Sequence, residues 1–189
     1  MPDVLAPVRP TPPANEAVIG PNGDQHSQAW TQYHKAVSDW IAEQNNKGAS
    51  DGSEAAAGDI GEFRTISVTS GGAHGMTTFT AIDVTFLDLP AGDWDVWGNV
   101  CFVPNATTTC QTIAGWISPG SATLPGAIEQ QGYTTIRANF LTGGQQALSV
   151  GRVRLLSTAG TTRVYLSALA GFAVSFMNVF GTLNARRMR

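Results

Sequence analysis

From residue 61 to residue 187, apolar side chains recur at every second position in short runs, and no helical period interrupts them. Such alternation turns one face of each run toward a core, which is typical of β-strands. Clusters of glycine, proline and small polar residues separate the runs, as connections between strands require. The eight runs are 62–69, 77–87, 93–103, 109–118, 132–140, 146–156, 162–170 and 175–187.

Eight antiparallel strands in about 130 residues predict a two-sheet β-sandwich of jelly-roll type, so the fold class is mainly β. We call residues 61–189 the head. Its clearest run, 93–103, places alternate residues inward: Trp94, Val96, Gly98, Val100 and Phe102. The same rule groups Ile82 and Val84 with Phe86 on one face of their run. In run 146–156, it groups Val150 with Arg152 and Arg154, opposite Gly151, Val153 and Leu155.

Charge is distributed unevenly along the head. Residues 61–129 carry six acids and one base, whereas residues 130–189 carry seven arginines and no acid. If both segments share a sheet, opposite charges pair between neighbouring strands, and Asp93 and Asp95 are the expected partners of Arg152 and Arg154. The formal net charge of −3 does not suggest a nucleic-acid partner.

Residues 27–46 form an expected helix with an a/d seam of mostly aromatic and apolar residues: Trp30, Tyr33, Val37, Trp40 and Gln44. The helix is expected to begin near Ser27 or Asp24 and to end before Asn45. Two interpretations of the seam stay open: packing on the chain's own globular domain, or self-association as a short parallel bundle. The small-polar linker at 47–60 favours self-association, because it separates the helix from the head.

Residues 1–26 hold six of the ten prolines and form an extended arm with little helix or sheet of its own. A disordered tail is one interpretation, and an element that docks to a larger assembly is the other. Candidate anchoring residues in the arm are Pro7, Pro10, Pro12, Pro13 and Ile19. The arm has no apolar segment of the kind found in secretory signals, and no apolar stretch is long enough to span a bilayer. We therefore expect synthesis in the cytoplasm and no membrane partner.

The only two cysteines, Cys101 and Cys110, flank the segment FVPNATTT. If Asn105 and Ala106 centre a tight turn, the two cysteines face each other across a hairpin, and a disulfide is geometrically possible. In a cytoplasmic chain, two reduced, buried thiols are the favoured interpretation.

Sequence signatures of catalysis are missing: there is no phosphate-cradling glycine loop, no GxSxG and no HExxH. His74 with Asp83 is the one conceivable acid–base or metal pair, and a solvated histidine is the simpler reading. Asp93 and Asp95 share one strand face and are read as partners of arginine. We expect no enzyme activity, no cofactor and no bound metal.

Two stretches, LPAGDWDVWGNVCF at 89–102 and VFGTLNARRMR at 179–189, resemble the β-sandwich heads of small tail-fibre or head-fibre proteins of tailed bacteriophages. The resemblance covers roughly residues 61–189, and a weaker one covers the segment VIGPNGDQHSQAWTQYHKAV. It implies a homotrimer with a tumour-necrosis-factor-like or jelly-roll head, anchored to the virion by its N-terminus. It carries over no catalytic residue.

We therefore expect a bacteriophage virion fibre protein whose partners are its own copies, other virion proteins and a host surface glycan or protein. The alternative is a structural collar, decoration or adaptor protein without receptor binding. A polysaccharide depolymerase is a third class, for which the chain offers few carboxylates. Receptor contacts are expected on loops at the end of the sandwich farthest from residue 60, at His74, Asn105, Thr107 and Thr142.

Overall fold

The computed structural model describes residues 10–13, 28–44, 54–124, 126, 132–158 and 160–188. The chain divides into two compact units, Met1–Lys47 and Gly48–Arg189.

The first unit contains helix α1, Gln28–Gln44, which ends where the sequence predicted. Of the seam residues, Trp30, Tyr33 and Val37 are partly buried, and the side chains of Trp40 and Gln44 lie outside the described part of the structure. The rings of Trp30 and Tyr33 meet edge to face, with centroids 5.6 Å apart. Residues 10–13, which include Pro10, Pro12 and Pro13, have no helix or strand. The candidate anchoring residues Pro7 and Ile19 lie outside the described residues.

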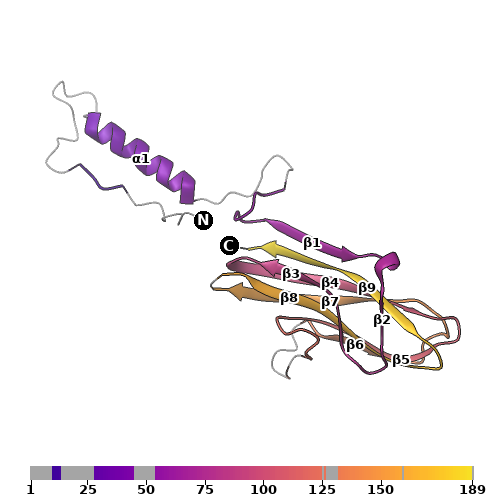
Figure 1. Ribbon diagram of the computed structural model, residues 1–189. Coiled ribbons are helices and arrows are strands. Elements are labelled where there is room, and N and C mark those ends of the chain that lie inside the picture. Colours follow the sequence, from indigo (N-terminus) through magenta and orange to yellow (C-terminus); the bar gives the residue numbers. More distant parts are fainter. Residues whose placement is uncertain are drawn as a thin grey trace. The chain divides into compact units, whose positions relative to one another are not determined.

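The second unit is built from antiparallel strands and one short 3-10 turn, η1 (Ser70–Gly72). Among the described residues these strands are β1 (Phe63–Val68), β2 (His74–Gly75), β3 (Ile82–Leu89), β4 (Gly92–Pro104), β5 (Thr109–Ser118), β6 (Thr134–Arg137), β7 (Gln146–Ser157), β8 (Thr162–Ala173) and β9 (Met177–Arg187). They form two sheets, one in the order β1-β9-β4-β7 with β2 also paired to β9, and one in the order β3-β8-β5-β6 (Figure 1). The mainly β, two-sheet prediction is confirmed.

The pairing of the strands is nested along the chain. The first long strand, β1, pairs with the last, β9. Moving inward from both ends, β3 pairs with β8, β4 pairs with β7, and β5 pairs with β6. The two sheets are thus one long antiparallel ribbon, folded at the connection between β5 and β6 and rolled up so that β4 also meets β9 and β5 also meets β8.

The core lies between the two sheets and takes side chains from both. The inward residues predicted for β4 are all buried, including Trp94, Val96 and Phe102. They pack with residues of the second sheet such as Ile113 and Leu166. The alternation in this strand therefore predicted its two faces correctly, because each residue of β4 from Trp94 to Pro104 has a partner on β9 in unbroken register.

Two β-bulges reverse the predicted faces of other residues. In β3 the register shifts between Asp83 and Thr85, so Phe86 points outward and is 40% exposed, rather than sharing the face of Val84. Opposite β4, the register shifts between the pairs Gly98–Val150 and Val96–Val153, so Val150 is buried and does not share the face of Arg152. Both face assignments were wrong because a bulge adds one residue to one strand.

Cys101 and Cys110 do not face each other across a hairpin. Cys101 lies on β4 in the first sheet, whereas Cys110 lies on β5 in the second, so the 104–109 connection crosses between sheets. Both are free thiols; Cys110 is buried, and Cys101 is partly buried on the outer face. Burial raises the pKa of the Cys110 thiol. The hairpin disulfide considered from the sequence is therefore wrong.

Within the described part of the chain, no helix has the length and apolar character needed to cross a bilayer.

Candidate functional site

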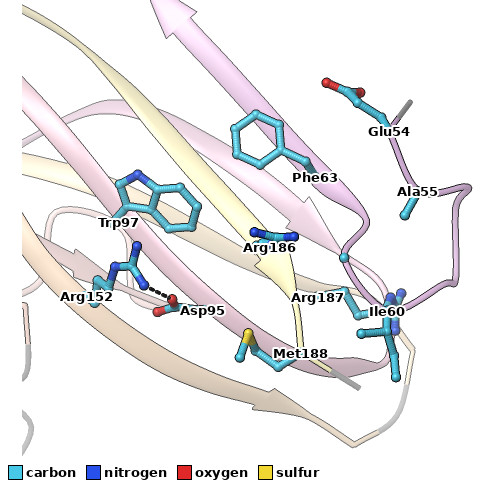
Figure 2. Close-up of a pocket in the computed structure, with 11 residues that line it drawn as sticks. Glu54, Ala55, Ile60, Phe63, Asp95, Trp97, Arg152, Arg186, Arg187 and Met188 are labelled. Atoms are coloured by element: carbon cyan, nitrogen blue, oxygen red, sulfur yellow. Dashed lines mark hydrogen bonds and ion pairs between the residues drawn. The ribbon is translucent and has the colours of Figure 1, made fainter. Parts of the chain in front are cut away.

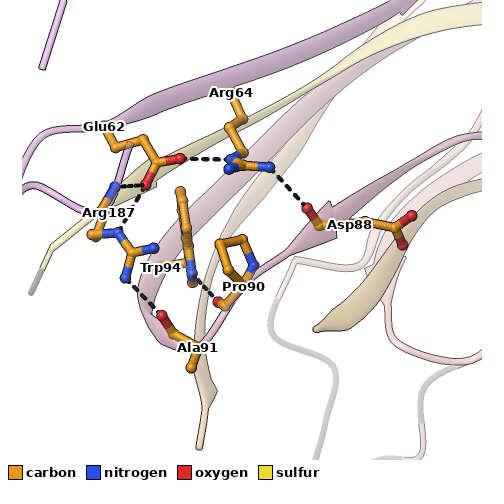
Figure 3. Close-up of polar contacts among 8 residues, drawn as sticks. Glu62, Arg64, Asp88, Pro90, Ala91, Trp94 and Arg187 are labelled. Atoms are coloured by element: carbon orange, nitrogen blue, oxygen red, sulfur yellow. Dashed lines mark hydrogen bonds and ion pairs between the residues drawn. The ribbon is translucent and has the colours of Figure 1, made fainter. Parts of the chain in front are cut away.

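One end of the sandwich is closed by a buried ion pair, and we call this the closed end. Glu62 and Arg187 are buried, and Arg187 Nε donates to Glu62 Oε2 at 3.0 Å. The other carboxylate oxygen accepts from Arg64 Nε at 2.7 Å. Arg187 Nη1 also donates to the Ala91 carbonyl at 2.7 Å, and its guanidinium lies 4.5 Å from the ring centroid of Trp94 (Figure 3).

The two stretches that carry the fibre-head resemblance meet at this cluster. The turn Pro90-Ala91-Gly92 supplies two carbonyl acceptors. The Trp94 indole N–H donates to the Pro90 carbonyl at 3.0 Å, and Arg187 Nη1 donates to the Ala91 carbonyl. Gly92 has a φ of +152°, and a Cβ there would stand closer than 3.0 Å to the Arg187 side chain. Glycine is therefore required for the guanidinium to reach the turn.

The closed end also holds the point where the chain enters the head. Gly58 N–H donates to Glu62 Oε2 at 2.8 Å, and Gly61 N–H donates to the Arg187 carbonyl at 2.9 Å. Arg64 of the first sheet reaches the Asp88 carbonyl of the second sheet at 3.3 Å. The first and last residues of the head are thus bound to each other and to both sheets.

Burial is the largest influence on the pKa of Glu62 and raises it. Together, the hydrogen bonds from Gly58, Arg64 and Arg187 outweigh the effect of burial and hold the pKa of Glu62 below its ordinary value. At the exposed Asp88–Arg163 pair, the hydrogen bond from Arg163 lowers the pKa of Asp88.

Acid is expected to destabilise the head through Glu62. Because the folded-state pKa is lowered, the stabilisation is fully present above the ordinary glutamate value of about 4.3 and is lost as the pH falls through the lower folded-state value. Glu62→Gln should therefore flatten the pH dependence of the free energy of unfolding between pH 7 and pH 3. Asp88→Asn is the matched comparison and should change it less, since water screens that pair. Equal slopes for Glu62→Gln and the natural chain would contradict this role.

We call the opposite end of the sandwich the distal end. The loops predicted from the sequence to contact a receptor lie there. Asn105 N–H donates to the Phe176 carbonyl at 3.0 Å, and Thr108 Oγ1 donates to the same carbonyl at 2.8 Å. Gly143 N–H donates to the Thr108 carbonyl at 3.2 Å, which joins the loop of Thr142 to the loop of Thr107. The structure thus brings together Asn105, Thr107 and Thr142; the two threonines are exposed and Asn105 is partly buried.

His74 lies beside this group rather than within it. It sits on β2 opposite Val179, two residues along β9 from Met177, and is exposed. The distal loops also expose large apolar side chains that the sequence reasoning did not single out: Leu141 is 84% exposed, Val174 is 78% exposed, and Phe176 is 55% exposed. Val174 has a φ of +84°, which is unfavourable for a β-branched residue.

A depression of about 690 Å³ lies on the outer face of the five-stranded sheet, and we call it the Trp97 depression. Its lining comes from the start of the head and from all four long strands of that sheet: Glu54, Ala55, Ile60, Gly61, Phe63, Asp95, Trp97, Arg152, Arg186, Arg187 and Met188 (Figure 2). It combines the exposed Phe63 ring and the partly buried Trp97 ring with charged side chains.

Aromatic and charged groups contact each other within the depression. The ring centroids of Phe63 and Trp97 are 6.0 Å apart, and the Arg152 guanidinium carbon lies 5.0 Å from the centroid of Trp97. Arg152 Nη1 donates to Asp95 Oδ2 at 2.7 Å. Next to it, Arg154 donates to Asp93 from Nε at 2.9 Å. The two arginine–aspartate pairs predicted from the charge distribution are confirmed.

The candidate acid–base pair of His74 and Asp83 is not formed. His74 lies on the first sheet and Asp83 on the second. Asp83 accepts instead from Ser167 Oγ at 2.6 Å, Ala122 N–H at 2.7 Å and Ser121 Oγ at 2.5 Å, which ties the loop after β5 to β3 and β8. In the described residues, no three of His, Cys, Asp and Glu gather in a way that suits a metal ion.

The Trp97 depression was missed as a site by the sequence reasoning, although one signal pointed to it. Alternation placed Trp97 on the outward face of its strand among Asp95 and Asn99. A tryptophan on a polar face is the signal. Phe63 and Arg152 come from strands 34 and 55 residues away, and only the order β1-β9-β4-β7 places them beside it.

Comparisons with known proteins found no matching family model and no matching curated protein. Similar solved structures are those of infectious bursal disease virus. The Gx strain matches with a TM-score of 0.41 at 9% identity, and the Gt strain with 0.40 at 12% identity. The VP2 subviral particle of the same virus matches with 0.41 at 11% identity. Each match covers 75% of this chain and 36% of the viral chain, so the chain spans about a third of their length.

Proposed function

We propose that this protein is a virion fibre protein of a tailed bacteriophage, made in the cytoplasm of the host bacterium. In this proposal the chain is a homotrimer. Its proline-rich arm docks to other virion proteins, and its head is exposed for host-surface recognition. Its helices associate along the seam of Trp30, Tyr33, Val37, Trp40 and Gln44.

The difference between the two ends of the head carries the proposal. The closed end binds the first and last residues of the head together through Glu62 and Arg187, at the place where the chain arrives from the linker. The distal end exposes hydroxyl groups and large apolar side chains on joined loops. A domain held at one end and exposed at the other suits a fibre head.

The strand order supports a jelly-roll head. Apart from the two-residue β2, the described residues of the head form eight strands, and the nested pairs β1–β9, β3–β8, β4–β7 and β5–β6 make a rolled antiparallel ribbon. A rolled antiparallel ribbon in two sheets is what a jelly-roll head, of the kind found in viral capsid and lectin domains, requires.

The helix supports self-association. Trp30, Tyr33 and Val37 recur at seam spacing on α1 and are only partly buried in a single chain. Burying one large apolar side chain contributes roughly 1.5–3 kcal/mol, so three chains with matching seams gain by associating.

The exposed apolar side chains at the distal end also fit a second function. Leu141, Val174 and Phe176 suit contact with a protein neighbour inside the particle, as in a collar, decoration or adaptor protein without receptor binding.

Host-cell adsorption separates the two functions and tests the distal loops. The purified trimer is expected to bind host cells and to block infection. Bulky substitutions, His74→Trp and Asn105→Trp, should reduce adsorption while leaving the melting temperature nearly unchanged, because both side chains lie on loops or edges away from the core. The control for both bulky substitutions is Gly71→Ala in the turn η1. The added Cβ would have only Thr69 Oγ1 within 4.0 Å.

Three results would count against the proposal. A monomer at micromolar concentration in sedimentation would exclude the trimer. Failure of the natural protein to bind cells, with normal incorporation into particles, would favour the collar or adaptor function.

Deletion of residues 1–26 should leave a folded trimer that no longer enters particles, and wild-type occupancy after the deletion would exclude the docking role of the arm.

A further inference from the structure

We propose that the Trp97 depression is a saccharide-binding site, so that the head binds a pyranose of a host surface glycan on the side of its five-stranded sheet. This inference rests on the proposed function and names the chemical class of the receptor. It adds a second contact surface to the distal loops.

The depression offers aromatic surface for the apolar face of a sugar ring. Trp97 is partly buried and Phe63 is 36% exposed, with an angle of 40° between their ring planes. The two rings are held by different strands, β4 and β1, and Arg152 of β7 lies over the indole. Rings fixed in this way lose little conformational freedom when a flat ligand packs against them.

Polar groups suited to sugar hydroxyls surround the rings. Asp95 is held by Arg152 and offers a second carboxylate oxygen as an acceptor. Arg186 lines the same depression and, among the described residues, makes no ion pair within 4.0 Å. A guanidinium with free N–H groups can donate two parallel hydrogen bonds to neighbouring hydroxyls or to a carboxylate.

Polar side chains continue this surface in the cross-strand row of Trp97 and in the row of Asn99. Thr65 Oγ1 donates to Asn184 Oδ1 at 2.8 Å, which leaves the Asn184 amide N–H groups directed elsewhere. Ser67 and Thr182 form the next pair at 2.9 Å. Hydroxyl and amide groups of this kind exchange hydrogen bonds with sugars at low cost in side-chain entropy.

The size and charge of the depression favour a saccharide over the other occupants. A volume of about 690 Å³ falls in the range of small-ligand sites, about 300–1,000 Å³. Asp95 and Glu54 offset Arg152 and Arg186, and the third arginine of the lining, Arg187, is paired with Glu62. The depression therefore does not have the large excess of positive charge that a phosphate polymer requires. A second copy of the head would have to fill a concave, charged depression rather than cover a flat apolar face.

An oligosaccharide array tests the site. The probes are defined pyranose oligosaccharides, half of them neutral and half containing a uronate, and the natural full-length protein is expected to bind at least one of them. Calorimetric titration of the strongest probe should show an affinity loss of roughly tenfold or more for Trp97→Ala and a smaller loss for Trp97→Phe, which keeps a ring. Arg186→Gln should weaken uronate probes more than neutral ones if the guanidinium binds a carboxylate, and both alike if it binds hydroxyls.

The matched control is Tyr165→Ala on the opposite sheet. Tyr165 pairs with Phe86 at a ring-centroid distance of 6.0 Å, and Arg163 lies 4.0 Å from the Phe86 centroid, so this cluster resembles the Trp97 depression in composition. The Tyr165→Ala variant should bind the array as the natural protein does.

Three outcomes would overturn the site: no probe bound by a natural protein that adsorbs to host cells, equal affinity for Trp97→Ala, or a changed oligomeric state for Trp97→Ala, which would make the face a subunit interface. Failure of the natural protein to adsorb, together with saccharide binding in vitro, would reject the proposed function and leave the site standing.

Discussion

Replacing Arg187 with alanine is expected to destabilise the head by about 3–5 kcal/mol, the usual cost of removing one partner of a buried ion pair. Arg187 and Glu62 side chains are only 8% and 5% exposed, so the remaining carboxylate cannot be solvated fully. The substitution also removes the hydrogen bond to the Ala91 carbonyl and the contact with the Trp94 ring. Denaturant unfolding followed by circular dichroism measures the loss.

Two variants give the Arg187 prediction its controls. The neighbouring Arg186→Ala removes the same charge from the opposite, exposed face and should change the free energy of unfolding by no more than about 0.5 kcal/mol. The double variant Glu62→Gln with Arg187→Met removes both charges and should recover much of the loss, because the buried carboxylate that Arg187→Ala leaves with Arg64 as its charged partner is then absent. The role of the pair would be excluded if Arg187→Ala cost no more than Arg186→Ala.

The strands of the head were predictable because most runs keep their alternation over their whole length. In β4 the inward set from Trp94 to Phe102 follows from the period alone. The faces of Phe86 and Val150 were not predictable in the same way, because a bulge depends on the register of the partner strand. A run read by itself contains no information about that partner.

The pairing of two strands could be predicted only where they carry charged residues of opposite sign. The aspartates of β4 and the arginines of β7 indicated that these two strands are neighbours, and the pairs Asp95–Arg152 and Asp93–Arg154 are present. A hairpin between β4 and β5 depended on a tight turn centred at Asn105 and Ala106. The two strands instead join different sheets, and this is decided by burial of their apolar faces on both sides of one core.

The stretches that carry the fibre-head resemblance have a structural explanation. Gly92 lets Arg187 reach the turn, Trp94 is buried beneath that guanidinium, and Gly98 and Gly181 allow β4 and β9 to approach closely. These residues stabilise the closed end and the centre of the sheet. They therefore indicate the fold of the head. The distal loops lie outside both stretches, whereas the Trp97 depression takes Asp95, Trp97, Arg186, Arg187 and Met188 from them.

The second large effect is expected for Gly181→Ala. Gly181 lies on β9, whose neighbour β4 runs through the middle of the five-stranded sheet, and a Cβ at this position would stand closer than 3.0 Å to the Asn99 carbonyl oxygen. That atom is backbone and cannot rotate away. The reverse contact is also tight, since a Cβ on Gly98 would lie 2.9 Å from the Thr182 carbonyl.

The strands must therefore separate to accept the Gly181→Ala methyl group, at the expense of hydrogen bonds along the β4–β9 pair. We expect a loss of about 3 kcal/mol or more in the free energy of unfolding, at or above the upper end for overpacking a core. Gly75→Ala is the matched control: it lies on β2, which also pairs with β9, and the nearest atom to the added Cβ is Asn178 Oδ1 at 3.8 Å. Thermal and denaturant unfolding of the two variants should differ by several degrees in melting temperature, because 1 kcal/mol corresponds to roughly 2–8 °C in domains of about 60–250 residues. Equal stability of the two variants would mean that β4 and β9 are not packed as closely as their two glycines indicate.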